Sequence, residues 1–313
     1  MSWTENDVPD QTGRTVVITG ANGGLGLENA RALANHGAHV VMAARNLDKA
    51  AEAERSVRDL HPEALVEVRQ LDLASLDSIA EFAAGFATDH HKLDILIANA
   101  GVMAIPEART IDGFEMQFGT NHLGHHALTA HLLPLLMTTP DSRVVTVTST
   151  ARHFGRPVDP DNPHLEDHYS PWRAYGQSKL ANVHFAVGLD EKLQAAGATT
   201  RALVAHPGLA TTDLQVNTTR QGGGDASERY AARFGMSPAD GALPQLRAAT
   251  DPNASGGELY APRWVNWGPP VRRPLFGRST NPEAIATLFA VSEAETGLSI
   301  DTAISGTETT GPR

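Results

Sequence analysis

Residues 15–26 read TVVITGANGGLG, an apolar run that leads directly into four glycines. The run Thr15–Thr19 is typical of a buried strand, and the residues after Gly26 have the period of an amphipathic helix. Glycine has no Cβ atom, so the backbone of such a turn can approach a pyrophosphate closely, while the helix N-terminus offers unpaired N–H groups. Because the turn joins a strand to a helix, we interpret it as a dinucleotide-binding turn rather than a tight connection without a ligand.

Strand and helix signals alternate from this turn to about Pro207. The strand signals are nearly continuous apolar runs, which is typical of parallel strands covered by helices on both faces. The predicted strands are Thr15–Thr19, His39–Ala43, Val66–Leu71, Asp94–Ala98, Arg143–Thr148 and Arg201–Ala205. The predicted helices are Leu25–Asn35, Leu47–Leu60, Ser75–Ala87, Phe114–Met137 and Ala174–Ala196. This order predicts an α/β fold of the Rossmann type, a doubly wound parallel sheet.

The regular alternation stops after the sixth predicted strand. Residues 216–227 are rich in Thr, Gly and Gln, and residues 262–279 are rich in Pro and Arg, which is typical of irregular segments. No internal repeat or linker divides the chain. We therefore expect a single domain over residues 1–313, with a core over 14–208 and a substrate loop and C-terminal cover over 209–313.

The composition excludes several classes of function. The chain has 313 residues and no cysteine, so disulfides, iron–sulfur clusters and thiol nucleophiles are ruled out. Its formal net charge of -11 disfavours nucleic acid as a partner. The acidic start, Met1–Gln11, does not resemble a signal peptide, and no apolar run approaches the roughly 20 residues of a spanning helix. We expect a protein without a membrane span, located in the cytoplasm.

The end of the second predicted strand bears on the choice of nucleotide. Enzymes that use NAD usually place an acidic residue there, where it holds the ribose 2′-hydroxyl. This chain reads MAARN over residues 42–46, without a carboxylate. The guanidinium of Arg45 could instead pair with a 2′-phosphate. We therefore expect NADP(H) rather than NAD(H); an Arg45 side chain that simply lies in water is the alternative.

Three side chains suggest acid–base chemistry. Tyr175 and Lys179 are four residues apart in a predicted helix, so they lie on one face of it. A neighbouring ammonium stabilises a phenolate, which predicts a lowered pKa for Tyr175. Ser149 follows the fifth predicted strand, at the edge where ligands meet such a sheet, and could hold a substrate oxygen. Thr148 and Thr150 are weaker candidates for that hydrogen bond.

Four motifs in this order resemble the short-chain dehydrogenase/reductase family. They are Thr19–Gly26, Asn99–Gly101, Ser149 and Tyr175–Lys179. The run SKLANV over residues 178–183 and the His before Pro207 are similar to the retinol-dehydrogenase-like branch, and the chain also resembles the protochlorophyllide-reductase-like branch. The resemblance covers about residues 14–208 and, more loosely, the remainder.

The resemblance implies a role for each matching position. Tyr175 is the implied acid/base, Ser149 its partner at the substrate oxygen, and Asn121 a helix residue whose backbone supports a water that leads to Lys179. Lys179 is implied both to hold the nicotinamide ribose and to lower the Tyr175 pKa. The implied cofactor contacts are Gly20, Asn22, Gly24, Leu25, Gly26, Arg45, Asp72, Leu73, Asn99, Ala100, Gly101, Tyr175, Lys179, Pro207, Gly208 and Thr212.

The implied reaction is a hydride transfer between nicotinamide C4 and a carbonyl or alcohol carbon. Apolar residues after Gly208 suggest a hydrophobic ketone, aldehyde or secondary alcohol, although burial in the core explains them equally well; they are Leu209, Leu214, Val216, Phe234, Trp264 and Trp267. A non-catalytic NADP-binding sensor is the alternative function. A Rossmann-type methyltransferase has no need of Ser149, Tyr175 and Lys179, and a serine hydrolase needs a Gly-x-Ser-x-Gly elbow that Ser149 lacks.

Other features remain open at this stage. The long segment Arg152–Arg173 is either a border of the substrate pocket or a surface insertion without a role. His122, His125 and His126 have helical spacing, but no nearby Cys or paired carboxylate completes a site, so we expect no metal. The Arg-rich stretch over residues 263–278 is expected at the surface or in a subunit contact. A homo-oligomer through the helices of Asn121 and Tyr175 is an option that the sequence leaves undecided.

Overall fold

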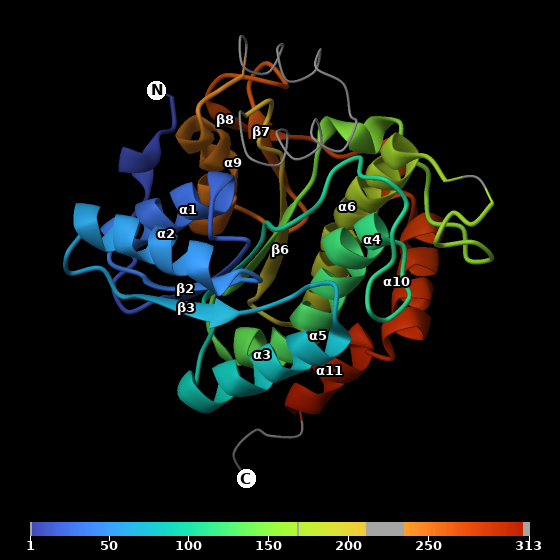
Figure 1. The fold of residues 1–313 in the computed structure, drawn as a ribbon, viewed down its shortest axis with the longest axis horizontal. Coiled ribbons are helices and arrows are strands. Elements are labelled where there is room, and N and C mark those ends of the chain that lie inside the picture. The colour runs from blue at the N-terminus through green and yellow to red at the C-terminus, as the bar shows by residue number, and fades with distance from the viewer. Residues whose placement is uncertain (1, 168, 211–234, 309–313) are drawn as a thin grey trace.

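The computed structural model describes residues 2–167, 169–210 and 235–308. Its centre is an eight-stranded sheet in the order β3-β2-β1-β4-β5-β6-β7-β8, parallel except where β7 meets β8 (Figure 1). The strands are β1 (Thr15–Thr19), β2 (His39–Ala44), β3 (Val66–Gln70), β4 (Ile95–Ala98), β5 (Arg143–Val147), β6 (Arg201–Ala205), β7 (Leu259–Pro262) and β8 (Pro270–Arg273). The order reverses between β1 and β4, which is where a doubly wound sheet binds its ligand.

Helices cover both faces of the sheet (Figure 1). One face carries α1 (Gly24–Asn35), α2 (Leu47–Leu60) and α9 (Pro238–Thr250). The other carries α3 (Leu76–Asp89), α5 (Gly124–Thr138) and α6 (Pro171–Ala195), with α10 (Pro282–Thr296) and α11 (Ile300–Glu308) packed outside them. The short elements are η1 (Glu5–Asp7), α4 (Met116–Phe118), η2 (Gly119–Leu123), η3 (Thr150–His153) and η4 (Gly277–Thr280).

The predicted fold class is confirmed, and all six predicted strands occur within one residue of their expected ends. Their side chains explain the continuous apolar pattern. In β1, β4 and β5 every residue is buried, because helices cover both faces of the strand. Gly37, at φ +91°, ends the first helix in the left-handed region that favours glycine.

The expectation of an irregular segment over residues 262–279 is wrong in part, because it contains β8, and the one expected over 216–227 lies outside the described residues. The C-terminal part over residues 235–308 is otherwise mostly regular. This part adds β7 and β8 to the sheet, and α9 packs across β4, β5, β6 and β7. Tyr260, in β7, is 2% exposed and belongs to the core under α9. The error has a physical cause: β7 and β8 are only four residues long and contain prolines, so they carry little strand signal.

The predicted helix over Phe114–Met137 is interrupted. After α4 the chain makes one turn of π-helix, η2, and then continues as α5. A methyl group on Gly124 would lie 2.4 Å from the Leu73 backbone oxygen, so glycine permits the close contact that follows the turn. Asn121 lies in the middle of η2, and a π-turn is frequently found at a functional site.

The helices in the described part of the chain are all too short or too polar to cross a lipid bilayer.

Candidate active site

A cleft of about 410 Å³ opens at the carboxyl edge of β1, β2 and β4. The predicted cofactor positions that line it are Gly20, Asn22, Gly24, Leu25, Arg45, Asp72, Leu73, Asn99, Ala100 and Gly101. Thr19 and Gly23, within the predicted turn motif, line it as well. The sequence did not indicate the other wall residues, which lie at or after the strand ends and in α4 and η2, namely Ala43, Ala44, Leu71, Val102, Met103, Ile105, Met116 and Thr120. The volume and position suit an extended dinucleotide.

The glycines of the cleft are required by close backbone contacts. A Cβ atom on Gly26 would lie 2.4 Å from the Gly20 carbonyl oxygen, and one on Gly20, at φ +67°, would lie 3.0 Å from the Ala100 Cβ. Gly26 itself does not line the cleft but lies under the turn. These contacts bring the turn and the end of β4 together, leaving the start of α1 free to face a pyrophosphate. The residues therefore fit a bound nicotinamide dinucleotide.

Polar residues around the cleft are held by the backbone. The Asn99 side chain donates to the Thr19 carbonyl oxygen at 2.9 Å. The Asp72 carboxylate accepts from the Ala74 N–H at 3.0 Å, which fixes the loop after β3. Arg45 is exposed at the end of β2, and its guanidinium has no hydrogen-bond or ion-pair partner among the residues that the structure describes. A cation thus lies free at the cleft, where a 2′-phosphate would be placed.

Tyr175 and Lys179 lie on one face of α6, and each is 4% exposed. The Lys179 Nζ atom lies 5.8 Å from the centre of the Tyr175 ring and donates to the Val147 carbonyl oxygen at 3.2 Å. Burial raises the pKa of Tyr175 to about 12, and a hydrogen bond with Ser149 opposes this rise. Burial lowers the pKa of Lys179 to about 8. The predicted lowering of the Tyr175 pKa is wrong for this structure, because desolvation of the phenolate dominates.

Ser149 and Thr148 point in different directions from the end of β5. The Ser149 hydroxyl caps η3, where it accepts from the Ala151 N–H at 3.3 Å, and it hydrogen-bonds to Tyr175. The Thr148 hydroxyl instead donates to the Lys179 carbonyl oxygen at 2.7 Å and is buried. Thr148 therefore links α6 to the sheet, whereas the Ser149 hydroxyl lies next to the phenol of Tyr175.

Asn121 is fully buried and connects the cleft to α6. Its side chain accepts from the Val102 N–H at 2.8 Å and donates to the Val102 carbonyl oxygen and the Ser178 hydroxyl, both at 2.9 Å. A methyl group on Gly101 would lie 2.8 Å from Asn121 Oδ1 and 3.5 Å from Lys179 Nζ. Gly101 is thus the point where the cofactor cleft meets the catalytic side chains.

The predicted nicotinamide contacts after β6 are described only in part. Gly208 has φ +73°, and a Cβ atom there would lie 2.6 Å from the Asn266 carbonyl oxygen. Pro207 and Gly208 follow β6 directly but do not line the cleft. Several predicted residues lie outside the described part of the chain, namely Thr212, Leu214, Val216 and Phe234.

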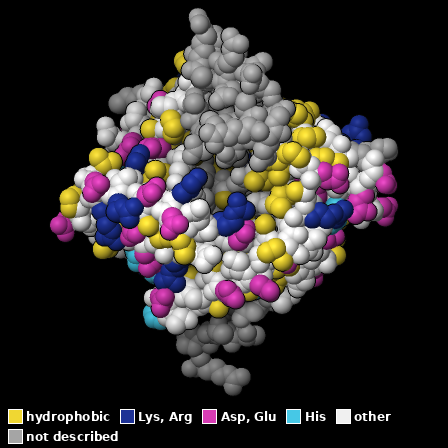
Figure 2. Space-filling view, in the orientation of Figure 1, with side chains coloured by type: hydrophobic (Ala, Val, Ile, Leu, Met, Phe, Trp, Pro, Cys, Tyr) yellow, Lys and Arg dark blue, Asp and Glu magenta, His cyan; other side chains and the backbone are white. Residues whose placement is uncertain are grey.

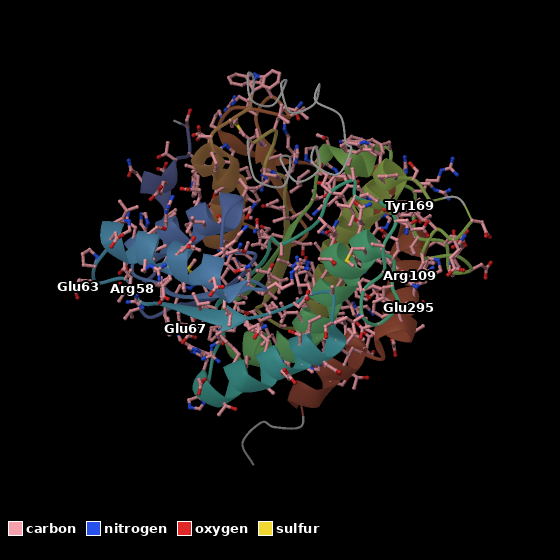
Figure 3. All side chains as sticks on the ribbon, viewed as in Figure 1. Arg58, Glu63, Glu67, Arg109, Tyr169 and Glu295 are labelled. Carbon is pink, nitrogen blue, oxygen red and sulfur yellow. The ribbon has the colours of Figure 1, made fainter. Side chains whose placement is uncertain are left out.

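The long segment after η3 is tied to the wall of the cleft. Tyr169 donates to the Ile105 carbonyl oxygen at 2.9 Å, and Ile105 lines the cleft. Figure 3 shows Tyr169, Arg109 and Glu295 along the side of the molecule formed by α10. Arg109 pairs with Glu166 at 2.9 Å, and Glu295 pairs with His164 at 3.1 Å. These contacts fix the segment against the wall of the cleft and against α10.

The three histidines of helical spacing are engaged in hydrogen bonds. His122, in η2, contacts the Ser292 hydroxyl of α10 at 2.8 Å, and His126, in α5, contacts the Leu298 carbonyl oxygen between α10 and α11 at 2.9 Å. His125 contacts Thr19 and Asn121. The described residues contain no group of three or more His, Cys, Asp or Glu side chains with the geometry of a metal site.

Comparisons with known proteins agree with this geometry. A family model described as short chain dehydrogenase matches residues 14–222. Human retinol dehydrogenase 13 is 44% identical over 207 residues, which make up 66% of this chain and 62% of that protein. The match therefore spans less than two thirds of that relative's length.

Solved structures show the same fold. An uncharacterized protein from Mycobacterium paratuberculosis is 41% identical, with a TM-score of 0.80 over 96% of this chain and 99% of that one. A short chain dehydrogenase from Escherichia coli CFT073, complexed with NADPH, is 22% identical, with a TM-score of 0.63 over 80% of this chain and 97% of that one. The glycine turn, the cleft and the Ser149, Tyr175 and Lys179 side chains thus occur within one matched region. The chain belongs to the short-chain dehydrogenase family of nicotinamide-dependent oxidoreductases, in its retinol-dehydrogenase-like branch.

Proposed function

We propose that this chain is an NADP(H)-dependent oxidoreductase that transfers hydride between nicotinamide C4 and a carbonyl or alcohol carbon, with Tyr175 as the acid/base. One observation carries the proposal. Gly101 closes the cofactor cleft and lies against both Asn121 Oδ1 and the Lys179 ammonium. A bound dinucleotide would therefore lie next to the catalytic side chains. Catalysis requires this proximity, whereas a protein that only binds the dinucleotide does not.

The chemistry divides between the cofactor and the chain. A bound nicotinamide supplies or accepts the hydride at the substrate carbon. In the direction of reduction, Tyr175 donates its phenolic proton to the carbonyl oxygen as the C–H bond forms and the C=O π bond breaks. The Ser149 hydroxyl donates a hydrogen bond to the same oxygen as negative charge develops there. Lys179 holds the ribose and keeps a positive charge near the phenolate that remains.

The pKa of Tyr175, raised to about 12 by burial, determines the protonation state of this side chain at neutral pH. At neutral pH the side chain is a protonated phenol, which is the form that reduction of a carbonyl requires. Oxidation of an alcohol requires the phenolate, which burial disfavours. In the protein without bound cofactor, Tyr175 therefore holds the proton that carbonyl reduction requires.

The preference for NADP(H) rests on Arg45. Its exposed guanidinium lies on the cleft without an ion-pair partner among the described residues, and no carboxylate occupies the end of β2. Titration of the tryptophan fluorescence with NADPH and with NADH tests this assignment. We expect tighter binding of NADPH; tighter binding of NADH would contradict the role of Arg45.

A hydrophobic ketone, aldehyde or secondary alcohol is the proposed substrate class. Figure 2 shows hydrophobic side chains gathered on the face over α4 and the start of α6, and Trp172 lies edge-on to Tyr175 with ring centres 6.0 Å apart. Human retinol dehydrogenase 13, one of the similar proteins, is by its name a dehydrogenase of retinol. A panel of carbonyls and alcohols followed by NADPH absorbance identifies the substrate.

The alternative is an NADP-binding sensor without catalysis. It would bind NADPH with the same cleft and show no turnover on any member of the panel. The buried Tyr175 and Lys179 pair argues against this alternative, because a sensor has no reason to keep an ammonium desolvated. We further infer one domain over the chain, since a single sheet runs from β3 to β8. Homo-oligomer formation and a cytoplasmic location stay predictions.

A further inference from the structure

His125 lies between the cofactor cleft and the catalytic helix. It is 1% exposed in the first turn of α5. Its Nε2 atom is 2.9 Å from the Thr19 hydroxyl at the end of β1, and its Nδ1 atom is 3.0 Å from the Asn121 carbonyl oxygen. One imidazole thus spans the end of the strand before the glycine turn and the π-turn that carries Asn121.

The direction of both hydrogen bonds follows from the atoms involved. A carbonyl oxygen can only accept, so Nδ1 must carry the proton. Burial lowers the pKa of His125 to about 4, and the neutral ring then has Nε2 as an acceptor. The Thr19 hydroxyl therefore donates to Nε2. The same hydroxyl accepts from the Asn99 N–H at 3.0 Å and the Ala100 N–H at 2.9 Å, and the Ile97 carbonyl oxygen, at 3.5 Å, is a more distant acceptor for its proton than Nε2.

The chain of hydrogen bonds continues to the catalytic helix. The Asn121 side chain contacts Val102, next to Gly101, and donates to the Ser178 hydroxyl, which donates to the Tyr175 carbonyl oxygen at 2.9 Å. Thr19, Asn121, His125 and Ser178 are buried, so water does not readily replace a lost partner. The network joins the ends of β1 and β4 to α6 in a single orientation.

We propose that His125 is a positioning residue for the reaction proposed above. Through Thr19 it holds the Asn99–Gly101 backbone against the cofactor, and through the Asn121 carbonyl it holds the π-turn beside Lys179. The two hydrogen bonds have separable effects. Loss of the Thr19 bond should weaken NADPH binding, and loss of the Asn121 bond should lower turnover, because only the second one fixes the surroundings of the catalytic side chains.

Two variants separate the two halves of the imidazole. In His125→Gln the amide can reach the position of Nε2 and accept from Thr19, whereas in His125→Asn it can reach the position of Nδ1 and donate to Asn121. His125→Leu removes both bonds. We expect His125→Leu to raise the Kd for NADPH and lower kcat, each by about 3- to 10-fold. Relative to His125→Leu, His125→Gln should restore only the wild-type Kd, and His125→Asn should restore only the wild-type kcat. Thr19→Val should raise the Kd for NADPH to the same extent as His125→Asn.

The matched control is His126→Gln, on the same helix. His126 is equally buried, but its imidazole contacts Leu298 and neither end of the network. This variant should lower the melting temperature without changing the Kd for NADPH or kcat. The inference would be overturned if His125→Gln and His125→Asn lost NADPH affinity and kcat to the same extent. It would also be overturned if Kd and kcat stayed unchanged in both variants and in Thr19→Val.

The same experiment distinguishes the failure of the proposed function. Wild-type protein that binds no NADPH and reduces no carbonyl would overturn both the function and the role of His125. If the wild-type protein binds NADPH and reduces a carbonyl but the His125 variants change only the melting temperature, the role of His125 would be overturned and the proposed function would stand.

Discussion

The cofactor half of the sheet, β1–β3, and the catalytic half, β4–β6, meet at one edge but rest on different interactions. Around β1 the chain packs closely because Gly20 and Gly26 leave no room for a Cβ atom, and the Thr19 and Asn99 side chains add hydrogen bonds. Around β5 they are made by buried polar side chains, namely Asn121, His122, His125, Thr148, Ser178, Lys179 and Asn182. Close packing at glycines predominates in the cofactor half, and hydrogen bonds of buried polar side chains predominate in the catalytic half. We therefore expect added methyl groups to damage the first half and lost hydrogen-bond partners to damage the second.

The largest expected effect separates chemistry from binding. Tyr175→Phe removes the proton donor without changing the ring, so kcat for carbonyl reduction should fall by about 10²- to 10⁴-fold while the Kd for NADPH changes little. Steady-state rates and fluorescence titration measure the two quantities. Tyr260→Phe is the matched control, because its hydroxyl contacts Glu258 on β7 and should not affect turnover. Retained turnover in Tyr175→Phe would remove Tyr175 from its role.

A methyl group in the glycine turn should break the cofactor half alone. In Gly26→Ala the new Cβ atom meets the Gly20 carbonyl oxygen, so the free energy of unfolding should fall by about 1–3 kcal/mol and NADPH binding should weaken. Gly85→Ala is the control: this exposed helical glycine has open space around it, and the change should stabilise the protein by about 0.4–1 kcal/mol. Urea denaturation distinguishes them, and equal effects would contradict the steric account.

Arg45→Ala tests whether the cofactor half also recognises charge. Loss of a charge-assisted hydrogen bond should raise the Kd for NADPH by about 10- to 100-fold and leave the Kd for NADH almost unchanged. Arg55→Ala, an exposed change in α2, provides the control for loss of positive charge. If both variants weaken NADPH binding equally, general electrostatic attraction rather than a specific contact of Arg45 would explain the preference for NADPH over NADH.

Acid should loosen the catalytic half first. Burial lowers the pKa of His125 to about 4 and of His206 to about 3, and it lowers the pKa values of His122 and His126. In the unfolded chain each titrates near 6.5, so below that pH the unfolded state binds more protons and stability falls. Each histidine lowers the free energy of unfolding by at most about 1.4 kcal/mol per pH unit, over the range from its unfolded pKa down to its folded pKa.

Hydrogen exchange measured between pH 7 and pH 5 locates this loss. Peptides from η2 and α5, which contain His122, His125 and His126, should lose protection before peptides from β1 and α1, which contain none of these four histidines. His126→Gln should flatten the pH dependence of stability without abolishing it. Uniform loss of protection across the sheet would show that the two halves do not differ in this respect.

The sequence predicted most of the cofactor half because glycine positions report backbone geometry directly. Gly20, Gly24 and Gly26 follow a buried strand, and that order alone indicates the turn. The same holds for Tyr175 and Lys179, whose helical spacing places them on one face. The prediction of one continuous helix over Phe114–Met137 missed the interruption at η2, because a π-turn leaves no trace in hydrophobic periodicity.

Taken alone, the sequence determined the positions of the first six strands, their membership of a parallel sheet, the glycine turn and the pairing of Tyr175 with Lys179, since these depend on local periodicity and residue type. Only the tertiary structure decided that β7 and β8 extend the sheet, that burial raises the pKa of Tyr175, and that His125 links Thr19 to Asn121. Burial and long-range hydrogen bonds depend on residues distant in the chain, and no local pattern contains that information.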